Sequence, residues 1–194
     1  MKDSVNINGI VLAGGKSSRM GSPKGLLDLN GRPFISHITA AMQPLVHELF
    51  IVSDDDTYDH FEGIRVPDIY TNAGPVGGIY AGLMRSTSFY NLILSCDVPL
   101  INSTVLKILI NNVEEGYDVI QLESEGQTLP LVAIYTQDCV AHFKNLLAAG
   151  ERRLRTAVRG LRVKTIPLDT SLTSFVQNIN TQTEYNSIKN ELEY

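Results

Sequence analysis

Residues 6–24 read NINGIVLAGGKSSRMGSPK. The first part of this segment, from Asn6 to Ala13, is short, apolar and rich in β-branched residues, which predicts a buried strand. The strand runs directly into a loop that begins with Gly14 and Gly15. A buried strand followed by a glycine-rich loop is typical of α/β proteins, whose ligands bind beyond the carboxyl ends of the strands.

Strand-like and helix-like patterns alternate along the rest of the chain. The apolar spacing predicts further strands and helices, and a Thr181-x-x-Glu184 capping box precedes a last helix. We expect strands at 49–52, 91–95, 119–122, 131–135 and 163–166, and helices at 33–42, 78–84, 103–113 and 139–149, with Ser103 as an N-cap. This alternation predicts an α/β fold: a doubly wound, mainly parallel sheet with helices on both faces.

The composition limits the class of protein. The chain has 194 residues, enough for one well-buried core, so we expect a single domain over residues 1–194. No apolar run reaches the roughly 20 residues of a membrane span, and residues 1–8 lack a secretory pattern, so we expect a cytoplasmic protein. The net charge of −5 argues against nucleic acid as a partner. Cys96 and Cys139 show no metal-ligand spacing.

The loop after the first strand has the composition of a phosphate-binding site. Gly14, Gly15 and Gly21 allow the backbone to turn its N–H groups inward, while Arg19 and Lys24 can neutralise polyphosphate charge. The spacing excludes a Walker P-loop, because isoleucine stands where its first glycine belongs, and a Gly-x-Gly-x-x-Gly signature is absent. A plain turn with solvated cations is the alternative, but the two cations favour phosphate binding.

Two aspartates stand at positions typical of ligand sites: one directly after a predicted strand, the other before a glycine-rich segment. Asp97 comes after the strand at 91–95 and can hold Mg²⁺, which prefers hard oxygen ligands and bridges substrate phosphates. The alternative is that Asp97 orders the turn before Pro99. Asp68 precedes the glycine-rich segment 74–78, whose following helix could present its N-terminus to an anion. A connecting loop explains these residues equally well.

The segment 150–160, GERRLRTAVRG, is the one basic cluster. Arg152, Arg155 and Arg159 fall on one face of a helix, where charge runs are usually solvated; an anionic substrate site is the alternative. Asn178 and Asn180 stand just before the capping box, where they can order a turn.

Seven segments together resemble the molybdenum cofactor guanylyltransferase family, a group of glycine-rich-loop nucleotidyltransferases. The resemblance spans most of the chain, and the combination of the glycine loop with GERR and NINT is far more specific than the loop alone. The segments are LAGGKSSRMGSPK (12–24), LNGRPF (29–34), GPVGGI (74–79), SCDVP (95–99), LPLVAIY (129–135), GERRLRTAVR (150–159) and FVQNINT (175–181).

The resemblance implies a Rossmann-like enzyme that transfers GMP from GTP to the terminal phosphate of molybdopterin-bound molybdenum cofactor and releases pyrophosphate. It also implies Mg²⁺ as cofactor on Asp97. Because such transfer relies on positioning and charge neutralisation, we predict Lys24, Asp97 and Arg19 as the catalytic residues. The resemblance implies that GTP contacts Leu12, Ala13, Gly14, Lys24, Asp68 and Asp97. We add Gly15 to this set because it belongs to the predicted phosphate-binding loop. Arg152, Arg153, Arg155 and Asn180 are assigned to the molybdopterin partner.

The chain departs from the family pattern at two positions. Ser53 stands where an asparagine is frequent in the nucleotide site, and Leu129 stands where a polar residue is common before Pro130. Three alternatives therefore stay open. They are cytidylyl transfer to the same cofactor, nucleotidyl transfer to a sugar or isoprenoid phosphate, and a non-catalytic nucleotide-binding module that regulates a partner protein.

Overall fold

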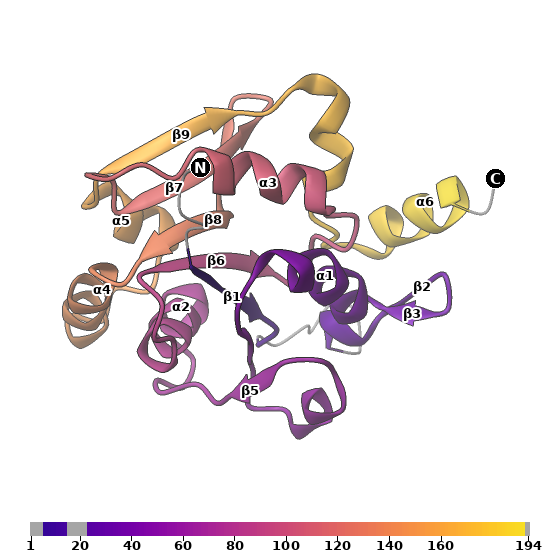
Figure 1. Cartoon of the computed structure of the whole chain (residues 1–194). Helices are drawn as coiled ribbons and strands as arrows, with labels where there is room; N and C mark the ends of the chain where they lie inside the picture. The colour runs from indigo at the N-terminus through magenta and orange to yellow at the C-terminus, as the bar shows by residue number, and fades with distance from the viewer. Residues whose placement is uncertain (1–5, 15–22, 193–194) are drawn as a thin grey trace.

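The computed structural model describes residues 6–14 and 23–192. Its centre is a seven-stranded sheet with the order β5-β4-β1-β6-β8-β7-β9 (Figure 1). The strands are β1 (Ile7–Leu12), β4 (Leu49–Val52), β5 (Ile64–Val66), β6 (Tyr90–Ser95), β7 (Val119–Ser124), β8 (Gln127–Thr136) and β9 (Val163–Pro167). The helices are α1 (Phe34–Met42), α2 (Gly74–Arg85), α3 (Ser103–Asn111), α4 (Cys139–Ala148), α5 (Leu154–Arg159) and α6 (Gln182–Leu192).

The sheet is mainly parallel, as the alternation of strands and helices predicts. β1 pairs in parallel with both β4 and β6, and β5 and β9 add parallel edges to β4 and β7. Only β8, of the strands described in this sheet, runs against its neighbours β6 and β7. The carboxyl ends of β1, β4 and β6 therefore meet at one edge, where a doubly wound sheet binds ligands.

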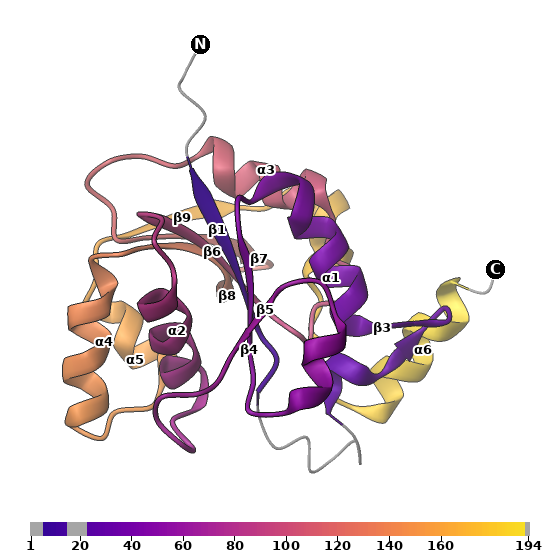
Figure 2. The same cartoon turned by 60° about the horizontal axis from the view of Figure 1, so that its bottom comes forward.

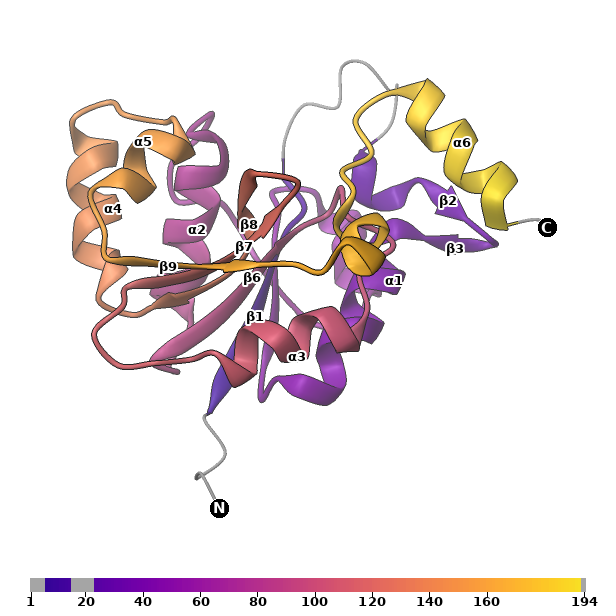
Figure 3. The same ribbon diagram turned by 90° about the horizontal axis from the view of Figure 1, so that it is seen from above.

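Helices cover both faces of the sheet. α1 and α3 lie on one face, and α2, α4 and α5 lie on the other, as Figures 2 and 3 show. Side chains alternate along β1: Val11 belongs to the apolar cluster beneath α1 and α3, and Ile10 to the cluster beneath α2 and α4. Both are fully buried, so this strand is apolar on both faces, as expected of a central parallel strand.

Two sequence-based boundaries were wrong. The helix expected from residue 78 begins at Gly74, so the glycine-rich segment forms the first turns of α2 rather than a loop. Pro75 fits there because the first helical N–H groups have no intrahelical partner, and Gly78 allows α2 to approach Leu12, whose Cδ2 would lie 3.3 Å from an added Cβ. Ser103 is not an N-cap: Asn102 Oδ1 accepts the Val105 N–H at 3.0 Å.

A small second unit lies beside the sheet. The strands β2 (Asp28–Leu29) and β3 (Arg32–Pro33) form a hairpin whose turn, Asn30-Gly31, has φ of 53° and 74°, as a type I′ turn requires. α6 packs against it, and the Tyr185 hydroxyl donates to the Asp28 carbonyl at 2.5 Å (Figure 3). The predicted capping box is present, since the Glu184 carboxylate accepts the Thr181 N–H at 2.8 Å.

Across the described residues, no helix combines the length and apolarity that crossing a membrane requires. Cys96 and Cys139 are both buried free thiols.

Candidate functional site

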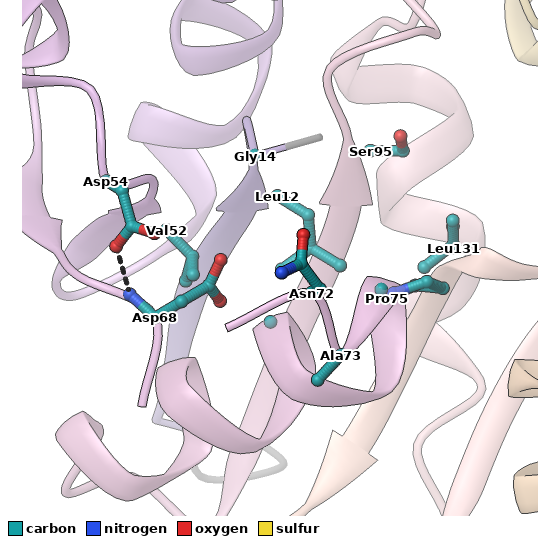
Figure 4. Close-up of a pocket in the computed structure, with 12 residues that line it drawn as sticks. Leu12, Gly14, Val52, Asp54, Asp68, Asn72, Ala73, Pro75, Ser95 and Leu131 are labelled. Atoms are coloured by element: carbon teal, nitrogen blue, oxygen red, sulfur yellow. Dashed lines mark hydrogen bonds between the residues drawn. The ribbon is translucent and has the colours of Figure 1, made fainter. Parts of the chain in front are cut away.

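A hollow of about 390 Å³ lies at the carboxyl ends of β1 and β4 (Figure 4). This volume falls within the roughly 300–1,000 Å³ typical of small-ligand sites. Its apolar walls come from two strand ends and from β8, and its polar rim comes from the loops after β4 and β5. The lining residues are Leu12, Gly14, Val52, Asp54, Asp68, Asn72, Ala73, Gly74, Pro75, Gly78, Ser95 and Leu131.

Two aspartates stand together at the rim of this hollow. The Asp68 N–H donates to Asp54 Oδ1 at 3.0 Å, which ties the loop after β5 to the loop after β4 (Figure 4). The Asp68 carboxylate lies close to Gly14, whose added Cβ would stand 3.4 Å from Oδ2. Burial raises the pKa of Asp68, and the nearby charge of Asp54 raises it further. The pair therefore presents carboxylate oxygens that favour a ligand rich in N–H or O–H donors.

The N-terminus of α2 opens onto the same hollow. Ala73, Gly74 and Pro75 line it, and an α-helix N-terminus carries free N–H groups and a partial positive charge. The Arg152 guanidinium donates to the Asn72 carbonyl at 3.0 Å, so a residue 80 positions away fixes the entrance to α2. This arrangement couples the basic segment to the wall of the hollow.

Lys24, Asp97 and Asn180 form a second polar cluster. The Lys24 ammonium lies 3.7 Å from Asp97 Oδ2 and donates to the Asn180 side-chain oxygen. The Asp97 carbonyl accepts the Ile179 N–H at 2.8 Å, which ties the C-terminal segment to the loop after β6. Asp97 Oδ1 is buried and has no hydrogen-bond partner within the part of the chain that the structure describes.

The two clusters adjoin each other at the ends of β1 and β6. The Cys96 N–H donates to the Leu12 carbonyl at 3.0 Å, so the residue before Asp97 is bonded to the strand that ends in Gly14. Ser95, which precedes Cys96, lines the hollow itself. A ligand that fills the hollow can therefore extend across the ends of both strands to Lys24 and Asp97.

The structure brings together most of the predicted nucleotide-site residues. Leu12, Gly14 and Asp68 line the hollow, and Lys24 and Asp97 form the adjacent cluster. Gly15 and Arg19 lie outside the described residues.

Ala13 and Ser53 belong to the framework around the hollow. Ala13 is 6% exposed, packs into the core beneath α1 and donates its N–H to the Val52 carbonyl at 3.0 Å. Ser53 is also buried, and its hydroxyl accepts the Asp55 N–H at 3.2 Å. The serine at this departure from the family pattern therefore orders the loop after β4.

The basic segment divides between three environments. Arg152 reaches the rim of the hollow, whereas the Arg153 guanidinium pairs with Glu151 Oε2 at 2.8 Å. Hydrogen bonds from the Arg153 side chain and backbone lower the pKa of Glu151 to about 2. Arg155 and Arg159 line a separate depression of about 480 Å³ between α5 and the strands β7 and β9. The expected single arginine face is therefore divided, because Arg152 precedes the first turn of α5.

Sequence reasoning missed Asp54, Asn72 and the bond between Lys24 and Asn180. Asp54 follows the strand predicted at 49–52, so the rule that ligands bind beyond strand ends was sufficient to find it. Asn180 is 156 residues from Lys24, and no local pattern signals such a contact.

One carboxylate of the second cluster fits a magnesium ion. Among the described residues, no group of three or more His, Cys, Asp or Glu gathers at one place. Magnesium does not require such a group, because it is commonly held by one or two carboxylates together with substrate phosphates and waters. Asp97 Oδ1, a carboxylate oxygen without a hydrogen-bond partner among the described residues, is the kind of hard ligand that such a site needs.

Comparison with known proteins identifies the family. Residues 9–165 match the model of the MobA-like NTP transferase domain. The chain is 34% identical to a probable molybdenum cofactor guanylyltransferase of Flavobacterium johnsoniae, across 92% of this chain and 94% of the relative. It is 31% identical to the molybdenum cofactor guanylyltransferase of Desulfosudis oleivorans, across 92% of each chain.

Solved structures agree on the fold. The molybdopterin-guanine dinucleotide biosynthesis protein A from Archaeoglobus fulgidus superposes with a TM-score of 0.82 and 22% identity, covering 96% of this chain and 98% of that one. The 4-diphosphocytidyl-2C-methyl-D-erythritol synthase of Anaerococcus prevotii superposes with a TM-score of 0.73 and 14% identity, covering 99% and 100%. Together with the family match, the fold and the two polar clusters lead to one conclusion: this chain belongs to the MobA-like NTP transferase domain family, a family of nucleotidyltransferases.

Proposed function

We propose that this chain is a molybdenum cofactor guanylyltransferase that acts in the cytoplasm, transferring GMP from GTP to the terminal phosphate of molybdopterin-bound molybdenum cofactor. One observation carries the proposal: a nucleoside-sized hollow at the ends of β1 and β4 adjoins a lysine–aspartate pair at the end of β6. The names of the relatives from Flavobacterium johnsoniae and Desulfosudis oleivorans support the choice of substrates.

The aspartates at the rim favour guanine over cytosine. Guanine presents an N–H and an amino group side by side, and an ionised carboxylate only accepts hydrogen bonds. The pyrimidine edge of cytosine offers one amino group and otherwise acceptors, which a carboxylate repels. Asp68, half-buried beside Gly14, supplies acceptor oxygens within the hollow, and Asp54 stands next to it.

The reaction joins the acceptor phosphate to the α-phosphorus of GTP. An oxygen of the acceptor phosphate attacks, the bond between the α-phosphorus and the bridging oxygen breaks, and pyrophosphate leaves with that oxygen. Such transfers depend on positioning and on neutralising phosphate charge. Lys24 supplies a positive charge near Asp97, and the N-terminus of α2, which lines the hollow, adds a partial positive charge.

We propose Mg²⁺ as the cofactor, held by Asp97. When bound, the ion neutralises phosphate charge and aligns the α-phosphate with its leaving group. The Asp97 carboxylate would hold the ion, and the Lys24 ammonium, 3.7 Å from Oδ2, would share the neutralisation of the phosphates.

We assign the acceptor to Asn180, which belongs to the second cluster, and to the basic segment, which reaches the rim of the hollow through Arg152. Arg153 is 79% exposed at its side chain and can approach an anionic ligand if it exchanges its contact with Glu151. Arg152, Arg155 and Asn180 complete the proposed set. Because Arg152 also holds the Asn72 carbonyl, it is expected to affect both substrates.

The direct test is a screen for pyrophosphate release. Purified protein with Mg²⁺ is offered GTP, CTP, ATP or UTP, each with molybdopterin-bound molybdenum cofactor, with a sugar phosphate or with an isoprenoid phosphate. We expect release only with GTP and the molybdenum cofactor. Preference for CTP supports the cytidylyl alternative, and tight GTP binding without release from any pair supports a regulatory nucleotide-binding module.

Lys24→Met tests the electrostatic role of the lysine. The change keeps the apolar stem and removes the charge, so kcat/KM is expected to fall by the equivalent of about 2–4 kcal/mol, the scale for one well-placed electrostatic donor. The thermal midpoint should change little, because Lys24 is a partly exposed residue. Steady-state kinetics with saturating Mg²⁺ measures the effect, and wild-type kcat/KM would remove Lys24 from the chemistry.

Asp68→Asn separates stability from binding. Burial raises the pKa of Asp68, so folding favours the protonated carboxyl over the ionised one. The contribution of Asp68 to the free energy of unfolding is therefore fully present below the pKa of the unfolded chain and is lost as the pH rises through the pKa of the folded protein. The variant should therefore be more stable at pH 7, by on the order of a few tenths of a kcal/mol for this half-exposed group, and the gain should vanish near pH 3. Its affinity for GTP should fall about tenfold, since one charged acceptor is lost.

Chemical denaturation across this pH range and calorimetric titration with GTP measure the two effects of Asp68→Asn. Asp59→Asn is the matched control, because Asp59 pairs with Arg65 on the surface and lies outside the hollow. Unchanged GTP affinity in Asp68→Asn would contradict a role in recognising the base or the ribose.

Arg152→Ala and Arg153→Ala distinguish the two substrates. Arg152→Ala should raise KM for GTP as well as for the molybdenum cofactor, because the Asn72 carbonyl loses its donor at the rim of the hollow. Arg153→Ala should raise KM only for the molybdenum cofactor, since its side chain contacts Glu151 rather than the hollow. Equal effects of both changes on both substrates, or none, would make the segment a solvated surface.

A further inference from the structure

Tyr58 lies beneath the second polar cluster. It belongs to the short helix η3 (Asp56–His60) in the connection between β4 and β5, and its side chain is 0% exposed. It belongs to the same core cluster as Cys96 and Val98, on the α1 side of the sheet. Its buried hydroxyl faces the Gly25 backbone, and no partner with good hydrogen-bond geometry stands among the described residues. Phenylalanine would avoid the cost of burying that oxygen, so packing alone does not explain a tyrosine here.

The Tyr58 hydroxyl stands directly against Gly25. An added Cβ at Gly25 would lie 2.6 Å from the hydroxyl oxygen, and 3.1 and 3.2 Å from Cε1 and Cζ of the ring. Gly25 is buried within the short helix η1 (Lys24–Leu26), and its backbone does not have a positive φ. Glycine is therefore needed here for space rather than for conformation. The tyrosine oxygen and this glycine set how closely η1 approaches the core.

The same ring lies beside the segment that carries Asp97. Cys96 is 6% exposed and shares the core cluster with Tyr58. Tyr58 thus contacts the residue after Lys24 and packs in the same core as the residue before Asp97. The segments that carry these two charged side chains are thus both anchored in the core that contains the Tyr58 ring.

We propose that Tyr58 is a positioning residue for nucleotidyl transfer, which holds η1 and the Asp97 segment at the separation that the reaction needs. This inference rests on the proposed function. The charged atoms of Lys24 and Asp97 stand 3.7 Å apart, and a small displacement of η1 changes that separation directly. Misplacement by about 1 Å can cost a catalytic site on the order of a hundredfold in rate.

The first experiment is a double-mutant cycle between Tyr58 and Lys24. Tyr58→Leu should lower kcat/KM by about tenfold or more in the wild-type background. In the Lys24→Met background most of that loss should disappear, because residues that act through one another are not additive. A merely structural residue would lower kcat/KM by the same factor in both backgrounds. Phe143→Leu is the matched control: it also removes a buried ring, but from the α4 side of the sheet.

The second experiment adds a methyl group at Gly25, where it meets the Tyr58 hydroxyl, and does not remove a buried ring. Gly25→Ala should lower the affinity for GTP with Mg²⁺, measured by calorimetric titration, and should lower kcat/KM. Adding Tyr58→Phe removes the atom that stands 2.6 Å away, so the double variant should recover most of both losses. If Gly25→Ala is harmless, or if Tyr58→Phe fails to rescue it, the inference is overturned.

Failure of this inference and failure of the proposed function give different results. If wild-type protein releases no pyrophosphate from GTP with any acceptor, the proposed function fails, and the rescue is then read from GTP affinity alone. If wild-type protein is active but the Tyr58 and Lys24 losses multiply independently, only the positioning role fails. Should Tyr58→Leu not fold, the Gly25→Ala and Tyr58→Phe pair decides the question.

Discussion

Parallel pairing joins β1 to β6 from Ile7 opposite Tyr90 to Leu12 opposite Ser95, and the Cys96 N–H extends it to the Leu12 carbonyl at 3.0 Å. Both polar clusters depend on this pairing. It places Gly14, at the end of β1, beside the segment that carries Asp97, although the two residues are more than 80 positions apart in the chain. A slip of one residue would exchange the side chains of β1 between two apolar clusters that are each closely packed, so packing on both faces fixes the register and with it the site.

The charges of the site are distributed to suit a nucleoside triphosphate. The chain as a whole carries a net charge of −5, so its overall field does not attract a polyphosphate. Attraction is local instead: the start of α2 offers free N–H groups, and Lys24 stands beside Asp97. Asp54 and Asp68 stand at the rim of the hollow, and Lys24 belongs to the other cluster, beside Asp97. In the proposed complex the base and ribose would meet the first two carboxylates, and the phosphates would meet the lysine.

Much of the fold was predictable because central parallel strands are apolar on both faces and alternate with amphipathic helices. β4 was predicted at its observed bounds, and the order of the other principal strands and helices was correct. The start of α2 was hidden by its glycines, which disfavour a helix by local preference, although Gly78 allows close packing against Leu12. β5, with three residues, was too short to leave a periodic signal. The Asn30-Gly31 pair is a common type I′ turn sequence, so the hairpin was predictable from the sequence as well.

The site was predictable in its local parts and unpredictable in its long-range contacts. Asp68 and Asp97 lie in segments that the strand pattern and the glycines indicate. The contacts of Lys24 with Asn180, and of Tyr58 with Gly25, join segments that only the tertiary fold brings together. Sequence spacing predicts one helical face for Arg152 and Arg155, but α5 begins only at Leu154. Arg152 therefore bonds to Asn72 at the hollow, whereas Arg155 lines the separate depression.

A crystal structure of the protein with a non-hydrolysable GTP analogue and Mn²⁺ in place of Mg²⁺ tests the central claim most directly. Anomalous scattering locates the manganese independently of the nucleotide. The account predicts guanosine in the hollow between Leu12 and Asp68, the α-phosphate beside Lys24, and manganese bound to Asp97. A nucleotide whose phosphates lie in the depression of Arg155 and Arg159, with no metal at Asp97, would contradict it.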